Sequence, residues 1–183
     1  LREKMTLFWH GHFATSFRKV ESMRLMHGQN RTLRQHALGD FRDLVLAISR
    51  DPAMIIWLDN QQNRKGKPNE NFARELMELF ALGEGHYSEH DVQEAARAFT
   101  GWHQDEVRFV FRREAHDFGP KEILGRRGNF NGDDVVDIVL QQRQAKRFLS
   151  TKLLEYFVMP NPDDELVDEA TQVLIDCNLE MKW

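Results

Sequence analysis

The sequence predicts a mainly α-helical protein, a single multi-helix domain with one small β-hairpin. Apolar residues recur at three- and four-residue spacing along most of the chain, which is the pattern of amphipathic helices. Side chains suited to helix N-caps precede several of these segments. The alternation typical of a strand is confined to residues 107–112. With 183 residues, of which 41% are hydrophobic and 30% charged, residues 1–183 are expected to form one domain.

Four helices are predicted in the first third of the chain. They cover residues 1–12, 30–36, 41–49 and 52–58. Asp40 and Asp51 stand where N-caps are needed, and Pro52 suits a first helical position because its missing N–H has no partner there. The polar stretch 61–68 is predicted to be an exposed loop, where mobility or cleavage is expected first.

Residues 68–102, the helix-pair segment, are the part around which the rest of the chain is organised. Two amphipathic helices joined by a tight turn are predicted there. Asn69 is the expected N-cap of the first helix, and Gly83 and Gly85 are expected to end it. Ser88 is expected to cap the second helix in a short capping box. Two such helices should pack as an antiparallel pair.

After the helix-pair segment the period of the apolar pattern changes. Val107, Phe109 and Phe111 alternate with other residues and predict a strand, and residues 121–124 are expected to pair with it across the HDFGP turn. The glycine-rich stretch 125–132 is predicted to be a loop, and it lacks the Lys-Ser/Thr ending of a phosphate-binding loop. Further helices are predicted over residues 133–141, 145–158 and 163–177.

Several long motifs in the same order resemble one protein family. The longest is NENFARELMELFALGEGHYSEHDVQEAARAFTGW, which begins at Asn69. It resembles the central signature of a bacterial family catalogued as domain of unknown function 1800. The likeness extends to FWHGHF (8–13), DPAMIIWLDN (51–60), HDFGPKEILGRRGNFNGDDVVDIVL (116–140) and KLLEYFV (152–158). The resemblance covers most of the chain and implies no agreed reaction.

The resemblance also bears on location and partners. Members of the family are longer proteins, and many are predicted to be exported and are encoded beside a second exported, phosphatase-like family. An exported or periplasmic location and an exported protein partner are therefore implied. The chain opens at Leu1 without an initiator methionine, a cap or a signal peptide, so we expect it to be a fragment of a longer chain.

Composition narrows the possible partners further. No apolar run approaches the roughly 20 residues of a membrane-spanning helix, so no transmembrane segment is expected. The single Cys177 excludes an internal disulfide and a cysteine-rich metal cage. Residues 1–50 carry nine Lys or Arg and four acids (+5), and residues 161–183 carry one Lys and seven acids (−6). The basic charge is dispersed, and nucleic acid is not an expected partner because only residues 108–113 approach a basic, aromatic stripe.

Three polar clusters are candidate site residues, and the first is His10-Gly11-His12. Histidines at i and i+2 point about 200° apart on a helix but lie on one side of an extended segment. His10 and His12 can therefore bind one metal ion only if the backbone leaves the helix at Gly11, which glycine permits. The alternative is that one ring is packed and hydrogen-bonded while the other is exposed.

The second cluster is Glu75 and Glu78, with Asn71 and Arg74 on the same helix face. Carboxylates placed in this way can bind a metal ion or hold a proton donor beside a base, so both are candidate catalytic residues. Arg74 and Arg97 are candidates for holding an anionic substrate group. The alternatives are a solvated face on which Arg74 pairs with Glu78, or a buried polar network.

The third cluster is His116-Asp117, in a turn that follows the predicted strand. A histidine beside a carboxylate on such a loop is a common placement for functional groups, but it is equally a common turn composition. Together with His10 and His12, these residues form a nitrogen and oxygen ligand set suited to Fe, Mn or Zn. Their spacing matches no established short metal motif, so the set depends on its position in the family motifs.

Two functions from different classes follow from these clusters. The first is a metal-assisted or acid–base enzyme, in which all three clusters converge on one cleft. The second is a non-catalytic scaffold or protein-partner module, in which the same residues form buried ties between helices. The two differ in whether the carboxylates of the helix-pair segment meet the histidines from distant parts of the chain.

Overall fold

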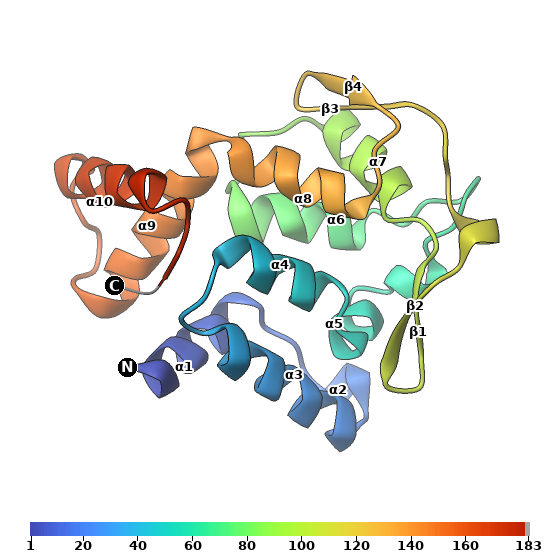
Figure 1. Cartoon of the computed structure of the whole chain (residues 1–183), viewed down its shortest axis with the longest axis horizontal. Coiled ribbons are helices and arrows are strands. Elements are labelled where there is room, and N and C mark those ends of the chain that lie inside the picture. The colour runs from blue at the N-terminus through green and yellow to red at the C-terminus, as the bar shows by residue number, and fades with distance from the viewer. Residues whose placement is uncertain (182–183) are drawn as a thin grey trace.

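Helices make up most of residues 1–181, the part of the chain that this computed structural model describes, and the prediction of a mainly α-helical fold is confirmed (Figure 1). The α-helices are α1 (Arg2–His12), α2 (Phe17–Val20), α3 (Met23–His36), α4 (Phe41–Ser49), α5 (Pro52–Trp57), α6 (Asn71–Glu75), α7 (Glu89–Ala98), α8 (Gly132–Gln141), α9 (Arg143–Phe157) and α10 (Asp164–Asp176). The other helical elements are the 3₁₀ turns η1 (Asn60–Gln62) and η3 (Arg113–Ala115) and the π-helix η2 (Leu76–Ala81). The strands are β1 (Trp102–Asp105), β2 (Arg108–Phe111), β3 (Lys121–Ile123) and β4 (Arg126–Gly128).

Near the N-terminus, one helix is longer than predicted and one further helix was not predicted. The sequence predicts a helix only from residue 30, but α3 begins at Met23, after Ser22 accepts a hydrogen bond from the Leu25 N–H. The short α2 was not predicted, and it is separated from α3 by Glu21 in the left-handed region. The inner face of α3 carries a buried polar residue, Gln29, which interrupts its apolar pattern.

α4 and α5 begin where the sequence predicts. Asp40 and Asp51 are their N-caps, and each side chain accepts hydrogen bonds from two backbone N–H groups of the first turn. Pro52 occupies the first turn of α5. The local chemistry of the Asp-Pro and Asp-Phe junctions is therefore sufficient to start both helices.

The loop over residues 61–68 is exposed only in part. Residues 64–68 are exposed, as predicted, whereas Asn63 is 3% exposed. Asn63 Nδ2 donates to the Ala96 carbonyl of α7 (2.8 Å), and Asn63 Oδ1 accepts from the Asn69 N–H (3.0 Å). This buried amide ties the loop to α7, because a buried amide requires such partners.

The helix-pair segment contains a π-helix that the sequence did not predict. α6 begins at Asn71, whose N–H donates to Asn69 Oδ1 (3.0 Å), and the backbone then widens into η2. Gly83 and Gly85 end the helix as predicted, with φ of +82° and +81°. The widened turn places four apolar side chains in the core. They are Leu76, Met77, Phe80 and Ala81.

α7 begins as predicted and packs against α6. Ser88 forms a reciprocal capping box at its N-terminus. Phe72 of α6 meets Phe99 edge-on, with ring centroids 4.8 Å apart, while Arg74 reaches Glu89 at the opposite end of α7. Early residues of α6 therefore meet late residues of α7, as in an antiparallel pair.

The β-hairpin is present, but its pairing differs from the prediction. The sequence predicts that residues 121–124 pair with the 107–112 strand, and this pairing is wrong. β2 pairs instead with β1, with Trp102 opposite Phe111, because a short turn with Glu106 at φ +48° brings these two strands together at little loop-closure cost. β3 pairs with β4, so the stretch 125–132 is not all loop.

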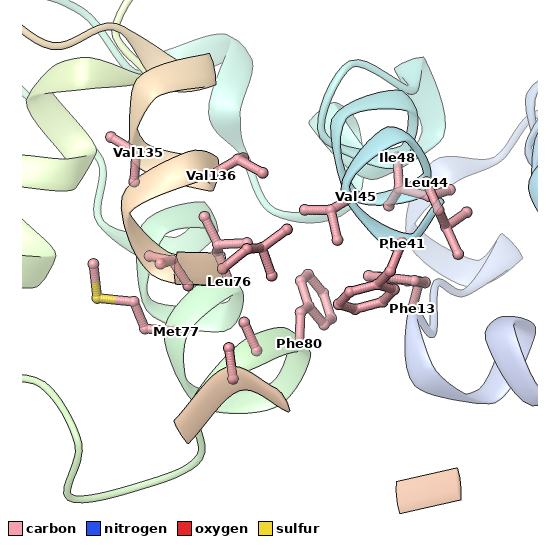
Figure 2. Packing of buried hydrophobic residues seen from close by; sticks show 14 of the residues in the cluster. Phe13, Phe41, Leu44, Val45, Ile48, Leu76, Met77, Phe80, Val135 and Val136 are labelled. Atoms are coloured by element: carbon pink, nitrogen blue, oxygen red, sulfur yellow. The ribbon is translucent and has the colours of Figure 1, made fainter. Parts of the chain in front are cut away.

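The core lies where η2, α4 and α8 meet (Figure 2). Figure 2 shows Phe80 of η2 beside Phe41 of α4 and Phe13, with Val135 and Val136 of α8 above Leu76 and Met77 in this view. The ring centroids of Phe13 and Phe80 are 5.1 Å apart, and those of Phe13 and Phe41 are 6.3 Å apart. α9 and α10 pack against each other at one end of the molecule, near α1 (Figure 1).

Candidate functional site

Arg97 of α7 joins two carboxylates that come from different parts of the chain. Glu94 stands one turn earlier on α7, and its two oxygens accept from Arg97 Nη1 at 2.7 and 2.8 Å. Arg97 Nε donates to Asp117 Oδ2 at 2.9 Å. The hydrogen bond from this guanidinium lowers the pKa of Asp117. The three side chains are largely buried, and they tie α7 to the loop that begins at His116.

Asp117 is held in place by its own backbone surroundings. Asp117 Oδ1 accepts from the Gly119 N–H (2.8 Å), which is the turn that the sequence predicts, and the Asp117 N–H donates to Thr100 Oγ1 (2.8 Å). Lys121, 2% exposed, donates to the carbonyls of Asp117 (2.7 Å) and Gly119 (2.9 Å). Burial lowers the pKa of Lys121. Sequence reasoning missed this lysine, because no pattern around it indicates burial.

His116 is a buried, hydrogen-bonded histidine. Its exposed fraction is 4%, and its Nδ1–H donates to the Thr100 carbonyl at 2.7 Å. The rings of Phe111 and Phe118 lie edge-on to it, with centroids 5.2 and 4.6 Å away. Burial lowers the pKa of His116, because these apolar neighbours disfavour the imidazolium.

Arg74 is engaged in the same way as Arg97. Its guanidinium donates to both oxygens of Glu89 (2.8 and 2.7 Å) and to Glu70 (3.0 Å). Among residues 1–181 it forms no ion pair with Glu78, which was the pairing considered from spacing. Glu78 accepts instead from the Tyr87 hydroxyl (2.9 Å). Arg74 therefore ties α6 to the N-terminus of α7.

Glu75 differs from the other predicted catalytic residues. It is half-buried, and within residues 1–181 its side chain has no hydrogen-bond partner. Burial raises the pKa of Glu75, and the nearby charge of Glu78 raises it further. Glu75 therefore holds its proton more tightly than an exposed glutamate does.

His10 and His12 lie on one continuous helix. α1 runs through Gly11, so His10 is exposed, whereas the His12 Nε2–H donates to the Phe80 carbonyl at 2.9 Å. Carbonyls at the end of a helix lack intrahelical partners, and His12 supplies one to the end of η2. Burial lowers the pKa of His12 to about 4. His12 also lines a cavity of about 410 Å³ with Lys152 and Glu155, which the sequence reasoning did not single out.

The structure brings together some of the predicted residues and leaves others apart. Arg97 meets Asp117, and Glu75 lies beside Glu78. Within the part of the chain that the structure describes, no group of three or more His, Cys, Asp or Glu side chains is arranged to hold a metal ion. Arg74 and Arg97 each lie between two carboxylates, and they join α6 to α7 and α7 to the loop that begins at His116.

The fold and these contacts define a mainly helical protein whose signature residues link α6, α7 and the loop that follows β2. The chain belongs to the family described as "Protein of unknown function (DUF1800)", whose model matches residues 1–183, the whole chain. The comparison with curated proteins and the comparison with solved structures found no match. Within residues 1–181, no helix combines the length and the apolar character needed to cross a membrane.

Proposed function

We propose that the chain is a non-catalytic scaffold that binds another protein, and that the polar residues of the helix-pair segment are structural ties. Arg74 and Arg97 each bind two carboxylates of the fold, which are the groups that a substrate would have to displace. The observation that carries the proposal is an apolar groove elsewhere in the molecule, between α1, α9 and α10.

The groove has a volume of about 490 Å³, and its walls are almost entirely apolar. Met5 of α1, Leu154 and Phe157 of α9, and Val173 and Leu174 of α10 contribute to them. Phe157 and Val173 are 39% and 45% exposed. Large apolar side chains that gather in an exposed groove are typical of protein-binding surfaces.

Charge beside the groove indicates the kind of partner. Glu165, Glu169 and Asp176 follow one side of α10 next to Val173, at helical spacing. They are exposed, and within residues 1–181 they form no ion pair. An amphipathic helix could place its apolar face in the groove and its Lys or Arg side chains next to these acidic residues of α10. The proposed partner therefore offers a basic amphipathic helix.

The test uses two synthetic helical peptides that share their leucine positions and differ in charge. A Leu/Lys peptide is expected to bind the chain at least about tenfold more tightly than a Leu/Glu peptide, because only its charges complement α10. Binding is measured by fluorescence anisotropy at low and high salt, since exposed charge pairs weaken as salt rises.

Two variants separate the groove from general charge attraction. Val173→Asp removes an apolar contact of the groove and is expected to weaken the binding of the Leu/Lys peptide at least about tenfold. Leu7→Asp adds the same charge at a side chain that is 64% exposed and lies outside the groove, and is expected to leave affinity unchanged. Equal effects of both variants would contradict the proposed docking surface.

An acid–base function of Glu75 and Glu78 is a second candidate, favoured by the raised pKa of Glu75. A carboxyl with a raised pKa can act as a general acid at a pH where an ordinary carboxyl has lost its proton. In a ¹³C NMR titration, the pKa of Glu75 is expected above its ordinary value of 4.5. Glu78→Gln is expected to lower it, because the neighbouring negative charge is removed.

The control for this titration is Glu84→Gln, a change at an exposed carboxyl beyond the end of η2. It is expected to leave the pKa of Glu75 unchanged. If Glu75 titrates at 4.5 in the unaltered chain, the carboxyl pair is not tuned, and this second candidate loses its support.

A further inference from the structure

A polar cavity between α3 and the start of α5 contains a buried carboxylate that the proposed scaffold function does not use. Its volume is about 380 Å³, and Arg24, His27 and Arg31 of α3 line it together with Asp51. It shares no lining residue with the apolar groove. A ligand of this cavity would therefore be independent of the partner proposed above.

Asp51 is 7% exposed, and its two oxygens have different surroundings. Oδ1 accepts from the N–H groups of Ala53 (3.0 Å) and Met54 (3.2 Å) and from Gln29 Nε2 (3.1 Å). Thr15 donates to the other end of the Gln29 amide and so fixes its orientation. Oδ2 has no hydrogen-bond partner within residues 1–181. Asp51 lines the cavity, so this oxygen is available to accept a hydrogen bond from a ligand bound there.

The residues of α3 that line the cavity are cationic. Arg24, His27 and Arg31 follow one side of α3 at helical spacing, and all three are exposed. None forms an ion pair with another residue of the described chain, whereas Arg34 on the same helix is paired with Glu3. The two arginines therefore present permanent positive charge that no carboxylate of the fold neutralises.

We propose that this cavity binds a protonated oxyanion, of which inorganic phosphate is the simplest. Arg24 and Arg31 would hold the charged oxygens, and Asp51 Oδ2 would accept the hydrogen bond of the P–O–H group. An anion without a proton would place its charge against Asp51. A neutral donor would leave the arginines without a partner. The proton is the feature that distinguishes hydrogen phosphate from sulfate at neutral pH.

The test compares these two anions by isothermal titration calorimetry on the intact chain, at pH 7 and equal ionic strength. Phosphate is expected to bind at least about tenfold more tightly than sulfate, since it gains a charge-assisted hydrogen bond where sulfate meets repulsion. Asp51→Asn keeps a side chain that caps α5 and can donate to either anion. It is expected to abolish the preference for phosphate.

Three further variants keep the proposal testable if Asp51→Asn alters folding. The double variant Arg24→Gln/Arg31→Gln is expected to weaken phosphate binding at least about tenfold. Arg18 is an exposed arginine outside the cavity, so Arg18→Gln is expected to leave phosphate binding unchanged. A Cβ at Gly28 meets no atom within 4 Å, so Gly28→Leu extends into the cavity and should block binding without disturbing the fold. Equal affinity for phosphate and sulfate, absence of phosphate binding, or indifference to Gly28→Leu would each overturn the proposal.

Discussion

Replacing Gly101 by alanine is expected to lower the free energy of unfolding by about 3 kcal/mol or more, from strain and overpacking together. Gly101 has φ +79°, which is unfavourable for a residue with a Cβ. The added Cβ would lie 2.5 Å from the Arg112 carbonyl oxygen and 3.2 Å from the His116 nitrogen. These are backbone atoms, so neither moves as easily as the end of a flexible side chain. Urea denaturation measures the change.

Gly85 provides a matched control for this prediction. Its φ is +81°, close to that of Gly101, but an added Cβ meets no atom within 4 Å. Gly85→Ala is therefore expected to cost only the backbone strain, about 1–2 kcal/mol. The difference between the two variants isolates the close contact where the helix-pair segment meets the loop after β2. Equal destabilisation by both would show that this contact contributes nothing.

Asp51 and His12 are expected to give opposite dependences of stability on pH. Burial raises the pKa of the Asp51 carboxyl from 3.8 to about 6, so the folded chain holds a proton that the unfolded chain has lost. The free energy of unfolding therefore falls as pH rises through this interval, by about 3 kcal/mol. Burial lowers the pKa of His12 from 6.5 to about 4, so the unfolded chain takes up the proton first. The contribution of His12 to the free energy of unfolding therefore rises with pH, by up to about 3 kcal/mol.

Single substitutions separate the two contributions. Asp51→Asn removes the unfavourable charge, so its stability should increase between pH 4 and 6.5 more steeply than that of the unaltered chain. His12→Gln keeps a donor for the Phe80 carbonyl and should shift the slope in the opposite direction. Urea denaturation at several pH values gives the slopes. All other carboxyls contribute equally to each protein, so parallel curves for the three would show that neither group is titrated as inferred.

Local chemistry made many features of the fold predictable. Asp40, Asp51 and Ser88 cap their helices because each side chain needs only the N–H groups of the next turn. Gly83 and Gly85 form the turn that follows η2, because both positions have a positive φ, which favours glycine. Such signals lie within a few residues of the structure that they specify, so no tertiary contact is needed to read them.

The predictions that were wrong or missing concern strand pairing and the π-helical backbone, both of which depend on residues distant in the sequence. The apolar alternation from Val107 to Phe111 indicates a strand but not its partner, because the pattern of one strand carries no register with another. The π-helix η2 has the same apolar spacing as an ordinary helix. Its extra residue per turn is accommodated by packing against α4 and α8, and the His12 side chain satisfies the Phe80 carbonyl at its end.

The candidate site also contains residues that the sequence indicated and contacts that it could not indicate. Sequence reasoning selected Arg74 and Arg97 as candidates for holding an anionic substrate group, whereas in the structure both are engaged by pairs of carboxylates of the fold. Their partners could not be assigned, because a guanidinium reaches any carboxylate that the fold brings within a few ångströms. Lys121 was missed because its partners are backbone carbonyls, which every residue carries.

The sequence by itself determined that this chain is mainly helical, where several helices begin and end, and which family it resembles. These properties follow from periodicity, capping and motif order, all of which are local or linear. Only the tertiary structure decided which charges meet, which strands pair, and that Asp51 combines a buried carboxylate with a cationic cavity wall. Burial and distance between remote residues set the strength of electrostatic contacts, and neither is written in the spacing of residues along one segment.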